Sequence, residues 1–129
     1  MPISRAACML VAIASIAGCT HDTMLLEGDI PLPEGLVTVR SADIRRSGGE
    51  VTGGRFILSG EIGDASAAMD RASVRFSANG WSRAAIDGDA SFAKARFVKG
   101  GRTVELELLR RGVDPRNSQG VLSVAAGGS

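Results

Sequence analysis

The chain has 129 residues, and its 15 basic and 14 acidic side chains give a formal net charge of +1. This length fits a single domain, and so balanced a charge argues against nucleic acid as a partner, because that binding depends on neutralising many phosphates. Aromatic residues make up only 4% of the chain, so we expect the core to use them before any ligand does.

An apolar run, residues 6–18, is the first feature along the chain, and Arg5 is the one basic residue before it. The run is too short for a spanning helix, which needs roughly 20 apolar residues, but it is typical of an export signal. It ends in Ile16-Ala17-Gly18-Cys19, which resembles a bacterial lipobox. That resemblance implies cleavage before Cys19 and attachment of a diacylglyceryl group to its sulfur. The alternative is an ordinary secretory signal that is cleaved at a small residue such as Ala17.

Lipid on Cys19 would hold the protein durably at a membrane, because several acyl chains bind far more strongly than one. Thr20 stands where an aspartate would imply retention in the inner membrane. By resemblance to enterobacterial lipoproteins, this implies the outer membrane, facing the periplasm. We therefore expect a bacterial envelope protein with residues 1–18 as its signal peptide. Residues 19–35, which include two prolines, are predicted to be a lipidated tether.

The tether is followed by a predicted β-hairpin, residues 35–62. Apolar and polar residues alternate in both of its arms, which gives each strand one apolar face. Between the arms, Ser47-Gly48-Gly49 and Gly53-Gly54 supply positions that tolerate a positive φ. These glycines match neither a dinucleotide-binding fingerprint nor a P-loop, so we interpret them as turns.

Residues 64–79 are the one convincing helix. Asp64 can cap its start, because a carboxylate accepts hydrogen bonds from the free amides of a first turn. Asn79-Gly80 can close its end. The small and apolar residues that recur at helical spacing, and so form one face, are Ala65, Ala68, Met69, Ala72 and Phe76.

Three more strands are predicted after the helix, at residues 81–86, 90–98 and 103–109. Gly100-Gly101 between the last two is a strong hairpin signal. Asp87-Gly88-Asp89 has carboxylates near a glycine, but it lacks the further acidic ligands of a calcium loop. We interpret it as a turn.

The predicted elements make an α+β fold in a single domain, residues 36–124. Short connections favour antiparallel pairing, so we expect an antiparallel sheet of four to five strands with one helix packed on one face. The order is ββαββ with four strands, or ββαβββ when all three strands after the helix join the sheet. The sequence leaves open whether residues 121–124 add an extra edge strand. Residues 125–129 are predicted to be a flexible tail.

This organisation resembles a group of small bacterial lipoproteins of unknown activity. The features that carry the resemblance are the proline-bearing entry Ile30-Pro31-Leu32-Pro33, the hairpin strand 56–62, the helix end Asn79-Gly80-Trp81 and the basic hairpin 92–109. Together they span most of the chain after the lipobox. The resemblance implies a lipoprotein and assigns neither an activity nor a site.

Few residues suited to catalysis remain after cleavage. Cys8 is removed with the signal and Cys19 carries lipid, so we expect no disulfide and no thiol nucleophile. His21 is the only histidine, whereas a metal site needs three or four ligands and a serine hydrolase needs a histidine base. Glu105 and Glu107 share the outward face of one predicted strand, where a solvated pair is the ordinary explanation. We predict a protein without catalysis, cofactor or metal.

The leading hypothesis is a membrane-anchored envelope lipoprotein that acts by binding, as an accessory or assembly protein docked on another envelope protein. Exposed strand edges suit this role, because an unpaired edge can pair with a partner chain. The candidate partner-binding residues are Trp81, Arg83, Arg110 and Arg111. Ordinary surface solvation is the alternative for the arginines.

A hypothesis from a different class is a protein that binds a small hydrophobic or glycan ligand in the periplasm. Its ligand would lie between the helix and the sheet. A cavity beside Ala68 and Ala72 would support this reading, and a packed interior would argue against it.

Overall fold

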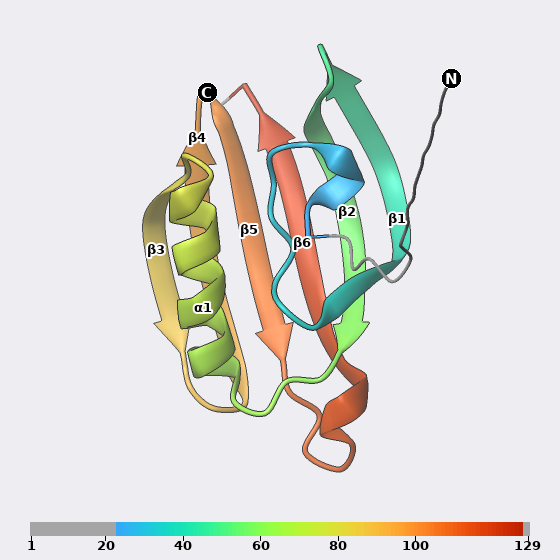
Figure 1. Ribbon diagram of the computed structural model, residues 1–129, viewed down its shortest axis with the longest axis vertical. Coiled ribbons are helices and arrows are strands. Elements are labelled where there is room, and N and C mark those ends of the chain that lie inside the picture. Colours follow the sequence, from blue (N-terminus) through green and yellow to red (C-terminus); the bar gives the residue numbers. More distant parts are fainter. Residues whose placement is uncertain (1–22, 128–129) are drawn as a thin grey trace, which may run out of the picture.

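The computed structural model describes residues 23–127. Its main feature is an open antiparallel sheet of six strands, in the spatial order β1-β2-β6-β5-β4-β3, with helix α1 (Ala65–Ala78) on one face (Figure 1). The predicted α+β class, and the helix on one face of an antiparallel sheet, are confirmed. The strands are β1 (Leu36–Ser47), β2 (Glu50–Gly60), β3 (Ser82–Gly88), β4 (Phe92–Lys99), β5 (Arg102–Leu109) and β6 (Ser118–Ala126), and two short 3-10 helices span Leu25–Glu27 and Pro115–Asn117.

The sheet has six strands rather than the predicted four to five, because β6 is a full strand in the middle of the sheet. β6 pairs with β2 on one side and with β5 on the other, so residues 121–124 do not form an edge. The strand also includes Ala125 and Ala126, which the sequence predicts to be tail. The first part of β6 was not predicted as a strand, because Gly120 interrupts the alternation of apolar and polar residues. A Cβ at Gly120 would lie 3.2 Å from a methyl of Leu36 and 3.3 Å from one of Leu108, so a larger residue there would have to displace these side chains.

Two hairpins turn at paired glycines, as predicted. Gly48 and Gly49, with φ of 58° and 88°, join β1 to β2, and Gly100 and Gly101, with φ of 54° and 83°, join β4 to β5. These left-handed conformations favour glycine and match the twist of the paired strands. The second predicted turn, Gly53-Gly54, instead lies inside β2, opposite an irregular part of β1.

Helix α1 agrees with the predicted helix to within one residue at each end. Its buried residues are four members of the predicted face: Ala65, Met69, Ala72 and Phe76. The ring of Phe76 stacks on Phe97 of β4, with 4.0 Å between the ring centroids. Asp64 caps the helix, since its Oδ1 accepts a hydrogen bond from the amide of Ala67 at 2.9 Å.

We expect Asp64→Ala to lower the free energy of unfolding by about 1 kcal/mol, because the amide of Ala67 loses its acceptor. Asp64→Asn is the matched control, since it keeps a side-chain oxygen at the same place. Urea unfolding followed by circular dichroism measures both variants. Equal losses in the two variants would contradict a capping role.

The described part of the predicted tether, residues 23–35, packs against the sheet, and we call it the strap. Leu25, Ile30 and Leu32 of the strap are 1%, 1% and 4% exposed and belong to the core. The strap covers the half of the sheet formed by β2 and β6, next to α1 and on the same face (Figure 1). The folded domain therefore extends before its predicted boundary at residue 36.

The predicted signal peptide, residues 1–18, and the predicted lipid-bearing Cys19 lie outside the described residues. The same is true of His21 and Asp22. Within residues 23–127, no helix has the length and apolar character needed to cross a membrane.

The opposite face of the sheet carries neither the helix nor the strap. On β5, Glu105 and Glu107 point to this face, in alternation with buried residues such as Leu106. Glu105 pairs with Arg96 of β4, with 3.0 Å between Oε2 and Nη2. The outward face predicted for this strand is confirmed.

Candidate functional site

Trp81, one of the predicted contact residues, belongs to the core. Its side chain is 3% exposed, and its ring meets that of Phe76 edge to face, with 6.0 Å between the centroids. Its Nε1 donates a hydrogen bond to the backbone oxygen of Asp29 in the strap at 2.9 Å. Because the indole is used in this way, it is not the exposed contact that the sequence predicted.

The three predicted arginines lie at opposite ends of the sheet. Arg83 is near the start of β3, where Ser82 pairs with Val98 at the end of β4. Arg110 and Arg111 follow the last residue of β5, which runs antiparallel to β4. The predicted residues therefore do not form one surface, because strand pairing places Arg83 far from the other two.

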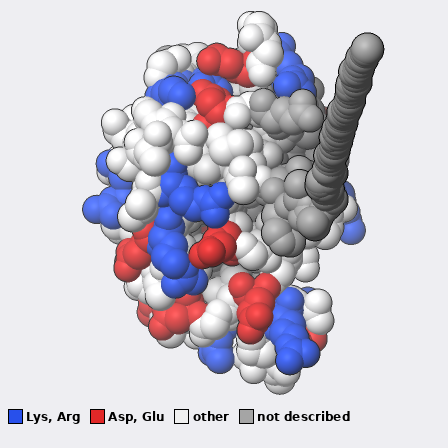
Figure 2. Space-filling model, viewed as in Figure 1, with Lys and Arg blue, Asp and Glu red and all other residues white. Residues whose placement is uncertain are grey.

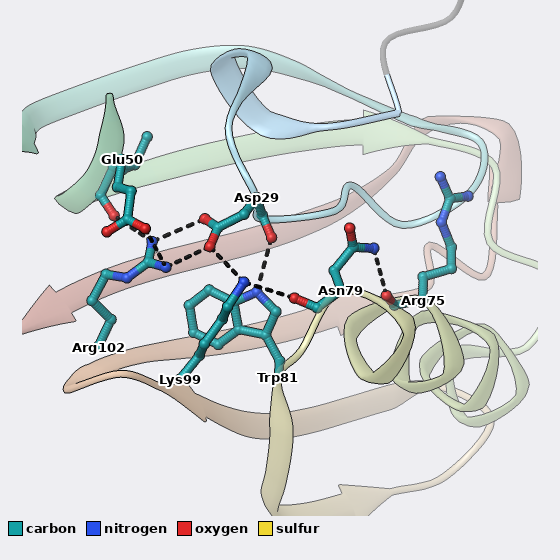
Figure 3. A network of polar contacts seen from close by, with 8 residues as sticks. Asp29, Glu50, Arg75, Asn79, Trp81, Lys99 and Arg102 are labelled. Atoms are coloured by element: carbon teal, nitrogen blue, oxygen red, sulfur yellow. Dashed lines mark hydrogen bonds and ion pairs between the residues drawn. The ribbon is translucent and has the colours of Figure 1, made fainter. Parts of the chain in front are cut away.

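A cluster of charged groups fastens the strap to the sheet (Figure 3). Its centre is Asp29, whose carboxylate accepts hydrogen bonds from Nη1 and Nη2 of Arg102 at 3.0 and 2.5 Å. Lys99 Nζ donates to the same carboxylate at 2.8 Å and to the backbone oxygen of Asn79 at 2.8 Å. Glu50 adds an ion pair with Arg102 at 3.6 Å. The strap, both glycine hairpins and the end of α1 thus meet at one point.

Burial makes these contacts stronger than those of a surface ion pair. The side chain of Arg102 is 6% exposed and that of Asp29 is 25% exposed. The guanidinium carbon of Arg102 lies 4.9 Å from the centroid of the Trp81 ring, and its Nη1 also donates to the backbone oxygen of Val51 at 3.2 Å. A bidentate pair between arginine and a carboxylate is among the stronger polar contacts in proteins. The cluster pairs its own charges, so we interpret it as structural.

Hydrogen bonds from Arg102 lower the pKa of Asp29 to about 2, and Lys99 acts in the same direction, while partial burial opposes both. In return, the Asp29 carboxylate raises the pKa of Arg102. A carboxyl group with a lowered pKa in the folded state stabilises the fold above its unfolded pKa and loses that contribution as the pH falls.

We expect the free energy of unfolding to fall by about 2 kcal/mol through this group as the pH drops from about 4 towards 2. Above that pH window, the contribution of Asp29 to the free energy of unfolding is complete and constant. Asp29→Asn should remove this part of the pH dependence, because an amide does not titrate. Urea unfolding of both proteins across the window measures the difference, and parallel curves would contradict the assignment.

Asp29, Lys99 and Arg102 were not predicted as a cluster from the sequence, although one signal was present. Lys99 and Arg102 flank the glycine turn and face each other across β4 and β5. Like charges directly opposite on paired strands repel each other, so such a pair needs a carboxylate from elsewhere. The sequence does not indicate which one, because Asp29 lies 70 residues before Lys99.

A groove of about 720 Å³ lies between the outer flank of α1 and strand β3. The helix and the strand lie side by side there, with β3 at the edge of the sheet (Figure 1). Its lining includes Asp70, Ser73, Val74 and Ser77 from α1, Trp81 just before β3, and Arg83 near the start of β3. Two of the four predicted contact residues, Arg83 and the buried Trp81, are thus in the lining of the groove.

The lining of the groove is suited to contact with another molecule. Val74 on α1 is 70% exposed and so presents an apolar side chain to solvent in the groove. Asp70 and Arg83 form no ion pair with another described residue. The Oγ of Ser73 is buried and has no hydrogen-bond partner in the described part of the chain. The groove therefore offers apolar surface and two unpaired charges of opposite sign.

The charges around the groove form no broad field. On the face that carries α1 and the strap, acidic and basic side chains are interspersed (Figure 2). Selection of a partner on this face would therefore depend on local pairs rather than on long-range attraction.

The interior between helix and sheet is filled where a small ligand was considered. Ala72 is 1% exposed, and Ala68 packs against the core. This packing does not favour a ligand cavity at these two alanines. In residues 23–127, no group of three or more histidine, cysteine, aspartate or glutamate side chains could hold a metal ion.

Comparison of the chain with protein-family models, curated proteins and solved structures found no match. In the described residues, the groove between α1 and β3 combines exposed apolar area, unpaired charges and a free sheet edge.

Proposed function

We propose that the protein is a lipid-anchored lipoprotein of the bacterial envelope that acts by binding another envelope protein and catalyses no reaction. The lipobox-like sequence Ile16-Ala17-Gly18-Cys19 supports the anchor, and Thr20 supports a place at the outer membrane, facing the periplasm. A small domain held at a membrane suits an accessory or assembly role, because the anchor confines it near its partner.

The observation that carries the binding role is the groove between α1 and β3. Contact with a partner would bury Val74 and would give Asp70 and Arg83 the opposite charges that they lack among the described residues. Buried apolar anchors surrounded by specific polar pairs are the usual composition of a protein interface. Arg110 and Arg111, at the other end of the sheet, are not part of this proposed surface.

The anchor is tested by Cys19→Ser. We expect the variant to leave the membrane fraction, and mass spectrometry of the unaltered protein to find acyl groups on Cys19. Cys8→Ser is the matched control, because it lies in the segment that cleavage would remove and should leave anchoring unchanged. An unmodified Cys19→Ser protein that stays in the membrane fraction would refute the anchor.

The binding role is tested by a photo-crosslinking amino acid placed at Val74 in the full chain in native membranes. The control position is Val113, which is fully exposed in the loop between β5 and β6. We expect a discrete protein adduct from position 74 and none from position 113. Adducts of the same proteins from both positions, or none from position 74, would refute the groove as the binding surface.

A further inference from the structure

We infer that the partner binds as an extended segment that pairs with the free edge of β3 and adds a strand to the sheet. This inference rests on the proposed binding role of the groove and specifies its mode. Strand addition uses backbone hydrogen bonds for affinity and pockets for alternate side chains for specificity. Both parts are present beside β3.

The outer side of β3 has no neighbouring strand among the described residues, although the amide of Gly88 already donates to Oδ1 of Asp87 at 2.9 Å. Among the described strands β3 pairs only with β4, and all 7 of its residues are exposed. Figure 1 shows it as the outer strand of the sheet beside α1. An unpaired edge of this kind is a template for another strand.

The other edge of the sheet, β1, is a poorer template. Its pairing with β2 shifts register at three places, and Asp43 within it has a φ of 57°. Such irregularities break the regular row of backbone groups that a new strand requires. In β3 the register shifts once, between Arg83 and Ala85, and then continues unbroken to Gly88. The structure therefore favours β3 as the edge that receives a partner.

The groove defines the chemistry of the incoming segment. A strand added to β3 would lie about 4.8 Å beyond it, so its alternate side chains would enter the groove under α1. Ile86 lies on that side, because its cross-strand neighbour Ala95 is buried in the core, and it is 38% exposed. Ile86 and Val74 fit apolar side chains at alternate positions, Arg83 fits a carboxylate, and Asp70 fits a cation. The partner segment is therefore apolar at alternate positions and carries an acidic and a basic residue.

Selection from a phage-displayed library of random heptapeptides, against the detergent-solubilised full chain, tests the inference. We expect enriched peptides to alternate apolar residues and to include an acidic one. On binding, the amide chemical shifts of residues 82–88 and 70–78 should change, and those of 36–47 should not. Methylation of the peptide's backbone amides should weaken binding by about tenfold or more, because it removes the donors that pair with β3.

Two charge-reversal variants distinguish a specific contact in the groove from a general effect of the protein's charge on binding. Arg83→Glu should weaken binding of an acidic peptide by about tenfold, and Arg111→Glu at the other end of the sheet should leave it unchanged. Peptides should regain affinity for Arg83→Glu when their acidic residue is replaced by lysine. This rescue requires a folded protein, so it also excludes unfolding as the cause of the loss.

Four results would overturn strand addition. They are the absence of enriched peptides, shift changes centred on β1, affinity that is indifferent to backbone methylation, and a homodimer in sedimentation experiments that occupies β3. If any of them occurred together with a partner adduct at position 74 in membranes, the proposed binding function would stand and only this mode would fall.

Discussion

Replacement of Arg102 by methionine is expected to lower the free energy of unfolding by about 3 kcal/mol, because it leaves a partly buried carboxylate with one cation fewer. Asp29 would keep only Lys99, and the backbone oxygen of Val51 would lose a donor. Methionine retains most of the aliphatic stem, so the loss reports the charged group rather than a cavity. Urea unfolding followed by the fluorescence of Trp81, the only tryptophan, measures it.

Arg96→Met is the matched control for this prediction. Arg96 also pairs with a carboxylate, at 3.0 Å from Glu105, but the two side chains are 52% and 37% exposed. An exposed pair contributes between about 0 and 1 kcal/mol, so the control should lose no more than that. Equal losses at the two arginines would contradict the special role of the strap cluster.

A double variant separates the lost contact from the charge that is left behind. If the penalty of Arg102→Met comes mainly from uncompensated charge, adding Asp29→Asn should restore part of the stability. Strictly additive losses would show that the two side chains act independently, which the hydrogen bonds between them argue against.

Leu122→Ala is expected to lower the free energy of unfolding by about 3 kcal/mol, the usual cost of emptying a leucine site in a core. Leu122 is fully buried and lies on β6 between Phe56 of β2 and Leu106 of β5. Its removal would therefore open a cavity in the row that joins the two halves of the sheet. Thermal and urea unfolding both measure this loss.

Leu109→Ala is the control, because Leu109 is 46% exposed at the end of β5. The same change of side chain there should cost less than about 1 kcal/mol. A loss at Leu122 as small as that at Leu109 would contradict the central position of β6 in the sheet.

Local chemistry made part of this fold predictable. The glycine pairs Gly48-Gly49 and Gly100-Gly101 predict their hairpins because left-handed turn conformations are decided by the turn residues themselves. Asp64 and the apolar spacing that ends at Phe76 predict α1 because capping and periodicity act within the helix. Each of these signals is contained in fewer than about 20 residues of sequence, the range over which propensity is informative.

Contacts between residues that are far apart in the sequence were not predictable. The sequence leaves open where residues 121–124 lie, and their place between β2 and β5 depends on strands more than one element away. The same limitation made Trp81 look like a surface contact, since its hydrogen-bond partner Asp29 precedes it by 52 residues. Arg83 and Arg111 look equivalent in sequence, yet one borders the groove and the other does not.

The two glycine hairpins and the extent of the helix could be predicted from the sequence alone, because each depends on neighbouring residues. The tertiary fold was needed to show that β6 is central, that the strap is part of the core, and that Asp29 binds two facing cations, Lys99 and Arg102. It also decided which sheet edge is regular and borders a groove. The physical reason is that burial and strand pairing are properties of residues brought together from distant parts of the chain, and a local pattern carries no record of which residues will meet.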